Sequence, residues 1–149
     1  MDKNDHGQEN ARGWLGSIRE MVAALQATED GEQATIDGIE YDDADEVRER
    51  IEESVLSVSV RSGWYAPGDQ EAAKPVEYEI LLTTGGPALR ITGELDAYGQ
   101  PNNARLEYQN WGIPWTRFNI YAECDEDIKA CSAAESDILT FAQCFYFGD

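Results

Sequence analysis

The side chains able to do chemistry in this chain are mostly carboxylates. Its 149 residues include 30 Asp and Glu against 11 Lys and Arg, which gives a formal net charge of −19 at pH 7. A pair of carboxylates acts as general acid and base only where a pocket perturbs their pKa values, and abundance does not identify such a pocket. The sequence leaves a catalytic carboxylate pair open without indicating where it would be.

Other residue types that carry catalysis are scarce. The single histidine, His6, lies in a polar N-terminal segment, which removes the usual histidine-based triads. Cys124, Cys131 and Cys144 have neither C-x-x-C spacing nor a histidine nearby, so we expect no metal site. The turn at Gly85 and Gly86 lacks the Lys-Ser/Thr of a phosphate-binding loop. We expect no cofactor, and an enzyme is the third of three functional hypotheses.

No part of the sequence indicates export or a membrane. No segment approaches the roughly 20 apolar residues of a transmembrane helix, and the polar start at residues 1–6 is unlike a signal peptide. An odd number of cysteines fits a reducing compartment, although a Cys124–Cys131 bridge stays open. We therefore expect a cytoplasmic protein.

Acidic residues are densest between Glu29 and Glu53, where twelve carboxylates are accompanied by only Arg48 and Arg50. A charge run of this kind is either a solvated surface that maintains solubility or a binding surface for a basic partner. Direct contact with nucleic acid or an anionic membrane is unfavourable. The candidate partner-binding residues are Asp42, Asp43, Asp45, Glu46, Glu49, Glu52 and Glu53.

Two helices are expected before any strand. A polar, flexible arm should extend to residue 10, with a single α+β domain over 11–149. Apolar residues then recur at helical spacing from Trp14 to Leu25. Residues 28–38 form a polar connector. A second helix should start at Asp43, the N-cap, with Glu46 reaching back in a capping box.

A change to two-residue alternation near Val55 predicts an antiparallel sheet of about five strands. The expected strands are 55–64, 76–82, 88–95, 104–110 and a short 116–121, with the second and third forming a hairpin across Gly85 and Gly86. Residues 122–136 are an acidic excursion. The aromatic run 138–147 predicts a last, largely buried strand, which could pair with its twin in a homodimer.

Trp111 and Trp115 form a second candidate partner-binding site. They flank Gly112 and Pro114 after the strand at 104–110. Two indoles this close together either provide a binding platform or pack the end of the sheet.

Four runs in the sequence resemble a family of small acidic proteins encoded by phages, prophages and other mobile elements of proteobacteria. They are SVLSVSVRSGW at 54–64, EILLTTGGPALRI at 79–91, LEYQNWGIPW at 106–115 and LTFAQCFYFG at 139–148. The resemblance implies a bacterial host cell and a mobile-element context. It assigns no activity, cofactor or catalytic residue.

This context and the charge suggest two hypotheses. The first is a non-enzymatic inhibitor of the anti-CRISPR or anti-restriction type. As a DNA mimic, it would bind a basic nucleic-acid site of a host defence protein. The second is a small accessory protein-binding module that uses the sheet around Trp111 and Trp115, with acidity serving only solubility.

Overall fold

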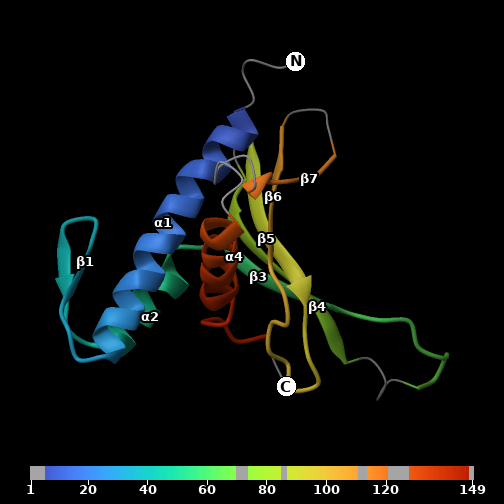
Figure 1. Cartoon of the computed structure of the whole chain (residues 1–149). Helices are drawn as coiled ribbons and strands as arrows, with labels where there is room; N and C mark the ends of the chain where they lie inside the picture. Colours follow the sequence, from blue (N-terminus) through green and yellow to red (C-terminus); the bar gives the residue numbers. More distant parts are fainter. Residues whose placement is uncertain (1–5, 70–73, 85–86, 111–113, 121–127, 148–149) are drawn as a thin grey trace.

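The computed structural model describes residues 6–69, 74–84, 87–110, 114–120 and 128–147 (Figure 1). Within these ranges the chain forms three named helices, a small hairpin and a larger sheet, which is an α+β arrangement. The elements are α1 (His6–Glu29), β1 (Ala34–Ile36), β2 (Ile39–Tyr41), α2 (Ala44–Glu53), β3 (Ser57–Ser62), β4 (Pro75–Thr83), β5 (Ala88–Glu94), β6 (Arg105–Gln109), β7 (Thr116–Arg117) and α4 (Ile128–Ala142).

The larger sheet is an antiparallel meander in the order β3-β4-β5-β6-β7. The predicted central hairpin is confirmed, since Ile80 pairs with Ile91 and Glu77 with Glu94. The glycine turn expected between these strands falls outside the described residues. The strand predicted over 116–121 is present as the two-residue β7.

Strand alternation places one face of the sheet in the core. Tyr78, Ile80, Leu89, Ile91 and Leu106 are all buried, whereas the residues between them are half-buried or exposed. Helices α1 and α4 lie beside this face, with α4 between α1 and the strands in Figure 1, and their apolar residues join the same core cluster. The opposite face of the sheet carries polar and charged side chains.

Helix α1 begins at His6, so residues 6–10 are helical and do not belong to a polar arm. The cause is a tertiary contact: the Gly7 N–H donates to Asn110 Oδ1 at 2.8 Å, beside the Tyr108 ring. Helix periodicity within residues 11–25 gives no information about this contact.

The connector expected at residues 28–38 contains a strand. β1 and β2 form a two-stranded hairpin whose turn consists of Asp37 (φ 49°) and Gly38 (φ 81°). Two consecutive residues with positive φ suit a tight hairpin turn, and Asp-Gly is a favoured pair for it. The two strands were not predicted because each has only three residues, too few to show alternation within a mostly polar segment.

The buried strand predicted over 138–147 is wrong, because residues 138–142 lie in helix α4. Its buried residues follow helical spacing at Cys131, Ala134, Ile138 and Phe141, and Phe145 continues the series past the helix end. Two of these five residues, Cys131 and Ala134, lie in the segment 122–136 interpreted as an acidic excursion. The proposed dimer contact through a terminal strand loses its basis.

Candidate functional site

Helix α2 carries the acidic residues singled out in the sequence. Asp43 is the N-cap, and its side chain accepts a hydrogen bond from the Asp45 N–H at 2.9 Å. This cap fixes the first turn directly after β2. Asp42 and Asp43, which precede the helix, are both exposed.

Five exposed carboxylates form what we call the acidic stripe. At about 100° per residue they span an arc of roughly 120° on α2. The opposite side of the helix presents Val47 and Ile51, which are fully buried in the core. The stripe therefore faces solvent along the whole helix. It consists of Asp45, Glu46, Glu49, Glu52 and Glu53.

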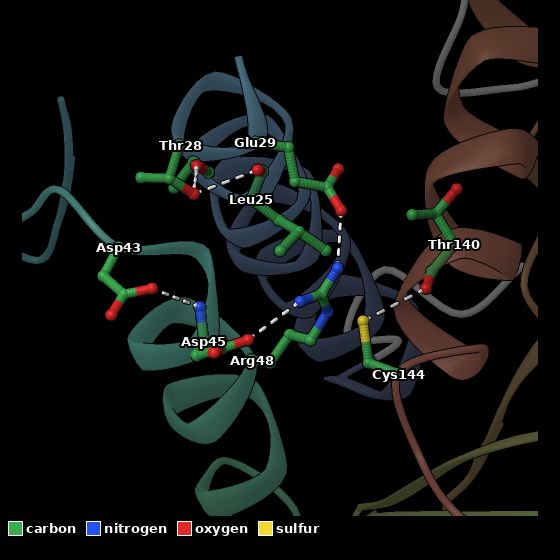
Figure 2. A network of polar contacts seen from close by, with 9 residues as sticks. Leu25, Thr28, Glu29, Asp43, Asp45, Arg48, Thr140 and Cys144 are labelled. Carbon is green, nitrogen blue, oxygen red and sulfur yellow. Dashed lines mark hydrogen bonds and ion pairs between the residues drawn. The ribbon is translucent and has the colours of Figure 1, made fainter. Parts of the chain in front are cut away.

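The two arginines of α2 lie on either side of the stripe and point toward neighbouring elements. Arg48 Nη2 lies 2.6 Å from Glu29 Oε2 on α1, and its Nη1 lies 3.2 Å from Asp45 Oδ1, as Figure 2 shows. Arg50 contacts Asp37 of the β1–β2 turn at 3.1 Å. Among the described residues, the remaining four carboxylates of the stripe have no ion pair.

The outer face of the sheet carries a second cluster, the arginine face, which the sequence interpretation missed. Arg90 Nε contacts Glu107 at 2.8 Å and Arg90 Nη1 contacts Glu79 at 2.8 Å. Arg61 binds Glu77 with two hydrogen bonds of 2.9 and 3.0 Å. The face comprises Arg61, Glu77, Glu79, Arg90, Arg105 and Glu107.

A shallow cleft of about 390 Å³ lies over the arginine face. Its charges balance, with three arginines and three glutamates among the lining residues. The sequence placed several of these side chains outward. It could not show which ones meet, because that depends on the register between strands.

Trp115 contributes to this face. The guanidinium carbon of Arg90 lies 4.1 Å from the centre of its ring, a cation–π contact. The indole is half-buried, so part of its surface serves to hold the arginine in place. Trp111, its expected companion, lies outside the described residues, and the structure does not test a two-indole platform.

Few pKa values are shifted in the described residues, and the clearest shifts come from burial. Burial raises the pKa of the Tyr78 phenol, whose hydroxyl donates to the Asn103 carbonyl at 2.6 Å. Burial also raises the pKa of Cys144 to about 11; its Sγ donates to the Thr140 carbonyl (Figure 2). The hydrogen bonds from Arg61 hold the pKa of Glu77 below its usual value. None of these groups lies in the acidic stripe.

Within the described ranges no three His, Cys, Asp or Glu side chains are grouped as metal ligands. His6 is exposed in the first turn of α1, with Glu9 at 3.8 Å as its neighbour. Cys131 is buried and donates to the Ile120 carbonyl. Cys124 lies outside these ranges, so the structure leaves open whether it pairs. No helix among the residues described is long and apolar enough to cross a membrane.

No protein-family model matches this chain, and neither a curated protein nor a solved structure resembles it significantly. The chemistry of its two charged surfaces is therefore the basis for a functional proposal.

Proposed function

We propose that this chain is a non-catalytic acidic protein that binds a basic nucleic-acid-binding surface of another protein and occupies it in place of nucleic acid. The observation that carries the proposal is the acidic stripe. Both nearby arginines are directed to the sides of α2, and Arg48 pairs with Asp45, so among the described residues four of the five stripe carboxylates have no ion pair. A surface that served solubility alone would not require this arrangement.

The spacing of the stripe fits this role. Residues on one helix face recur each turn of about 5.4 Å, while both strands of B-DNA together present one charge per roughly 1.7 Å of axis. Residues 29–53 hold twelve acids and two arginines, hence −10 of the total −19. Charge concentrated in this way accelerates encounter with a cationic channel and orients the complex.

The partner class follows from the resemblance to mobile-element proteins together with the charge. A host defence protein that handles nucleic acid offers a basic channel, and blocking that channel benefits a phage or plasmid. We therefore propose an inhibitor of the anti-CRISPR or anti-restriction type, acting inside the bacterial host cell.

Two variants of equal net charge test the proposal. One replaces Glu46, Glu49 and Glu53 with Gln in the stripe. The other neutralises Glu9, Glu20 and Asp69, which are exposed on α1 and in the loop after β3. Each carries three fewer negative charges, so −19 becomes −16 in both. Any difference between the variants therefore reports where the charge lies.

The measurement is capture from bacterial lysate at low salt, with the partner identified and then purified. We expect duplex DNA to compete, affinity to fall steeply as salt rises, and only the stripe variant to lose binding. Equal binding by both variants, or a partner that DNA does not displace, would refute the mimic.

A second candidate function is a binding module on the arginine face. The observation that favours it is the charge-balanced cleft beside Trp115. Trp115→Ala removes the stacked indole and leaves the acidic stripe unchanged. If this variant folds but loses the captured partner while the stripe variant retains it, the arginine face is the binding surface.

A further inference from the structure

Strand β3 forms one edge of the five-stranded sheet, and no described strand pairs with its outer side. It pairs only with β4, and among the described residues no helix or strand packs along its other side. The pairing extends one residue before the strand, where the Leu56 N–H donates to the Leu81 carbonyl at 2.8 Å. Residues 56–61 therefore offer a regular edge of backbone groups with no partner strand among the described residues.

The side chains along this edge are unusually apolar for an exposed strand. Leu56 is 59% exposed and Val60 42%. Val58, half-buried between them, packs against the core. These three residues alternate with Ser57 and Ser59, so the apolar set lies on the helix-covered side of the sheet.

The two edges of the sheet differ in a way that indicates a use. Natural edge strands are commonly short, charged, bulged or interrupted by proline. β7 has only two residues and follows Pro114 closely. β3 has six residues, and its register stays regular as far as Arg61. Among the described residues, 56–60 of the β3 edge contain no charge, proline or bulge, whereas β7 is short and lies close to a proline.

Charge distribution supports a second copy of this chain as the occupant. Residues 54–60 are SVLSVSV, seven consecutive uncharged residues in a chain where 28% are charged. Two molecules of net charge −19 repel each other, and contact is least costly where no acid lies on the contact line. The edge also matches itself, since an antiparallel pairing about Val58 sets Leu56 opposite Val60 of the partner, with serines meeting on the other face.

We propose that two copies pair antiparallel through β3 and join their sheets into one continuous sheet of ten strands. The inference does not depend on the proposed function.

The test measures mass by light scattering across protein concentrations and salt. We expect an equilibrium between a monomer of 16.6 kDa and a dimer of twice that mass. The fraction of dimer should increase with salt, because screening reduces the repulsion between the two chains. Binding to a basic partner should show the opposite salt dependence, so failure of one proposal is distinguishable from failure of the other. Amide exchange in 56–62 should slow as dimer forms.

Val60→Glu tests the contact and has a matched control. It places a carboxylate on the edge, opposite an apolar residue of the second copy, and should leave the chain monomeric. Val76→Glu introduces the same charge at a residue of similar exposure, 39%, on the same face of the neighbouring strand β4, and should still dimerise. A wild-type chain that stays monomeric at every concentration overturns the proposal, as does a dimer that persists in Val60→Glu.

Discussion

Arg90 joins three strands through its side chain. It is 23% exposed, and its guanidinium contacts Glu79 on β4, Glu107 on β6 and the ring of Trp115. Removing it would leave two partly buried carboxylates without their cation. A surface ion pair contributes up to about 1 kcal/mol to stability, whereas breaking a buried pair costs about 3–5 kcal/mol. The ion pairs of Arg90 are intermediate in burial, so their contribution should lie between these values.

We therefore expect Arg90→Gln to lower the free energy of unfolding by about 1–3 kcal/mol, measured by urea denaturation. Arg61→Gln is the control. Arg61, like Arg90, makes two hydrogen bonds to carboxylate oxygens, both of them to Glu77. Its side chain is 75% exposed, however, and we expect no measurable loss. Equal effects of the two substitutions would show that the burial of Arg90 is irrelevant.

Because the Cys144 thiol is partly buried, it should react more slowly with an alkylating reagent in the folded chain than in the unfolded chain. Its pKa is raised to about 11 from 9.0. At pH 9 the folded thiol is then about 1% ionised against half in the unfolded chain, so alkylation should be roughly 50-fold slower. Mass spectrometry of the Cys144 peptide, with and without urea, gives the ratio; similar rates in both states would contradict the burial.

The same shift has a consequence for stability. A group whose pKa is raised on folding stabilises the fold below its unfolded pKa, and this contribution is lost as pH rises through the folded value. The free energy of unfolding should therefore fall between pH 9 and 11, and Cys144→Ala should reduce that slope.

Helix α1 depends on a glycine at its docking end. A Cβ on Gly7 would collide with Cδ2 of Tyr108 and approach Asn110 Oδ1 to 2.8 Å. Gly13 and Gly16, in the same helix, have nothing within 4 Å of an added Cβ. The same substitution should therefore have opposite effects at these positions.

Gly7→Ala should destabilise the protein by about 1–3 kcal/mol, as overpacking does. Gly13→Ala or Gly16→Ala should stabilise it by about 0.5–1 kcal/mol, because alanine loses less backbone entropy in a helix. Thermal unfolding monitored by circular dichroism separates the three. Stabilisation by Gly7→Ala would mean that the first turn of α1 does not dock on β6.

The elements that sequence predicted well are those with local signals. The β4–β5 hairpin alternates over both strands, and α2 begins at a recognisable cap. Helix α4 was missed because its period becomes visible only when Cys131 and Ala134 are considered together with Ile138 and Phe141. The aromatic residues of 138–147 favour a strand by their β propensity. Within so short a segment the helical spacing of the buried residues is too weak a signal to outweigh that propensity.

The candidate sites divide in the same way. The acidic stripe was predictable because its carboxylates are neighbours along one helix, and every member is exposed as expected. The arginine face was not predictable, because Arg61, Arg90 and Arg105 come from three strands and meet only through register. The directions of Arg48 and Arg50 likewise depend on where α1 and the β1–β2 turn lie.

For the whole molecule, net charge should make stability depend on salt. A chain at −19 repels itself when folded, and added salt screens charges beyond about 10 Å at 0.1 M. The melting temperature should therefore rise with salt. Replacing all five stripe residues with Asn or Gln brings the charge from −19 to −14 and should make this rise smaller.

The quantity to compare is the slope of melting temperature against salt concentration. The melting temperature at a single salt concentration is less informative, because the substitutions also remove the Asp45–Arg48 pair and so lower stability at every salt concentration. Parallel slopes for the two proteins would indicate that the stripe adds little to self-repulsion.

The position of α1 has a consequence for the order in which the protein forms during synthesis. Its first turn bonds to Asn110, 103 residues later, and Arg19 contacts Asp137 across 118 residues. A ribosome adds about 5–20 residues per second, so the first helix waits several seconds for the elements that bury it. Helix α2 packs on α1 and shares its core. We therefore expect the surface of α2 to reach its final position only after residue 142 has been added, and, if the proposed function holds, a nascent chain should bind its partner only from that point on.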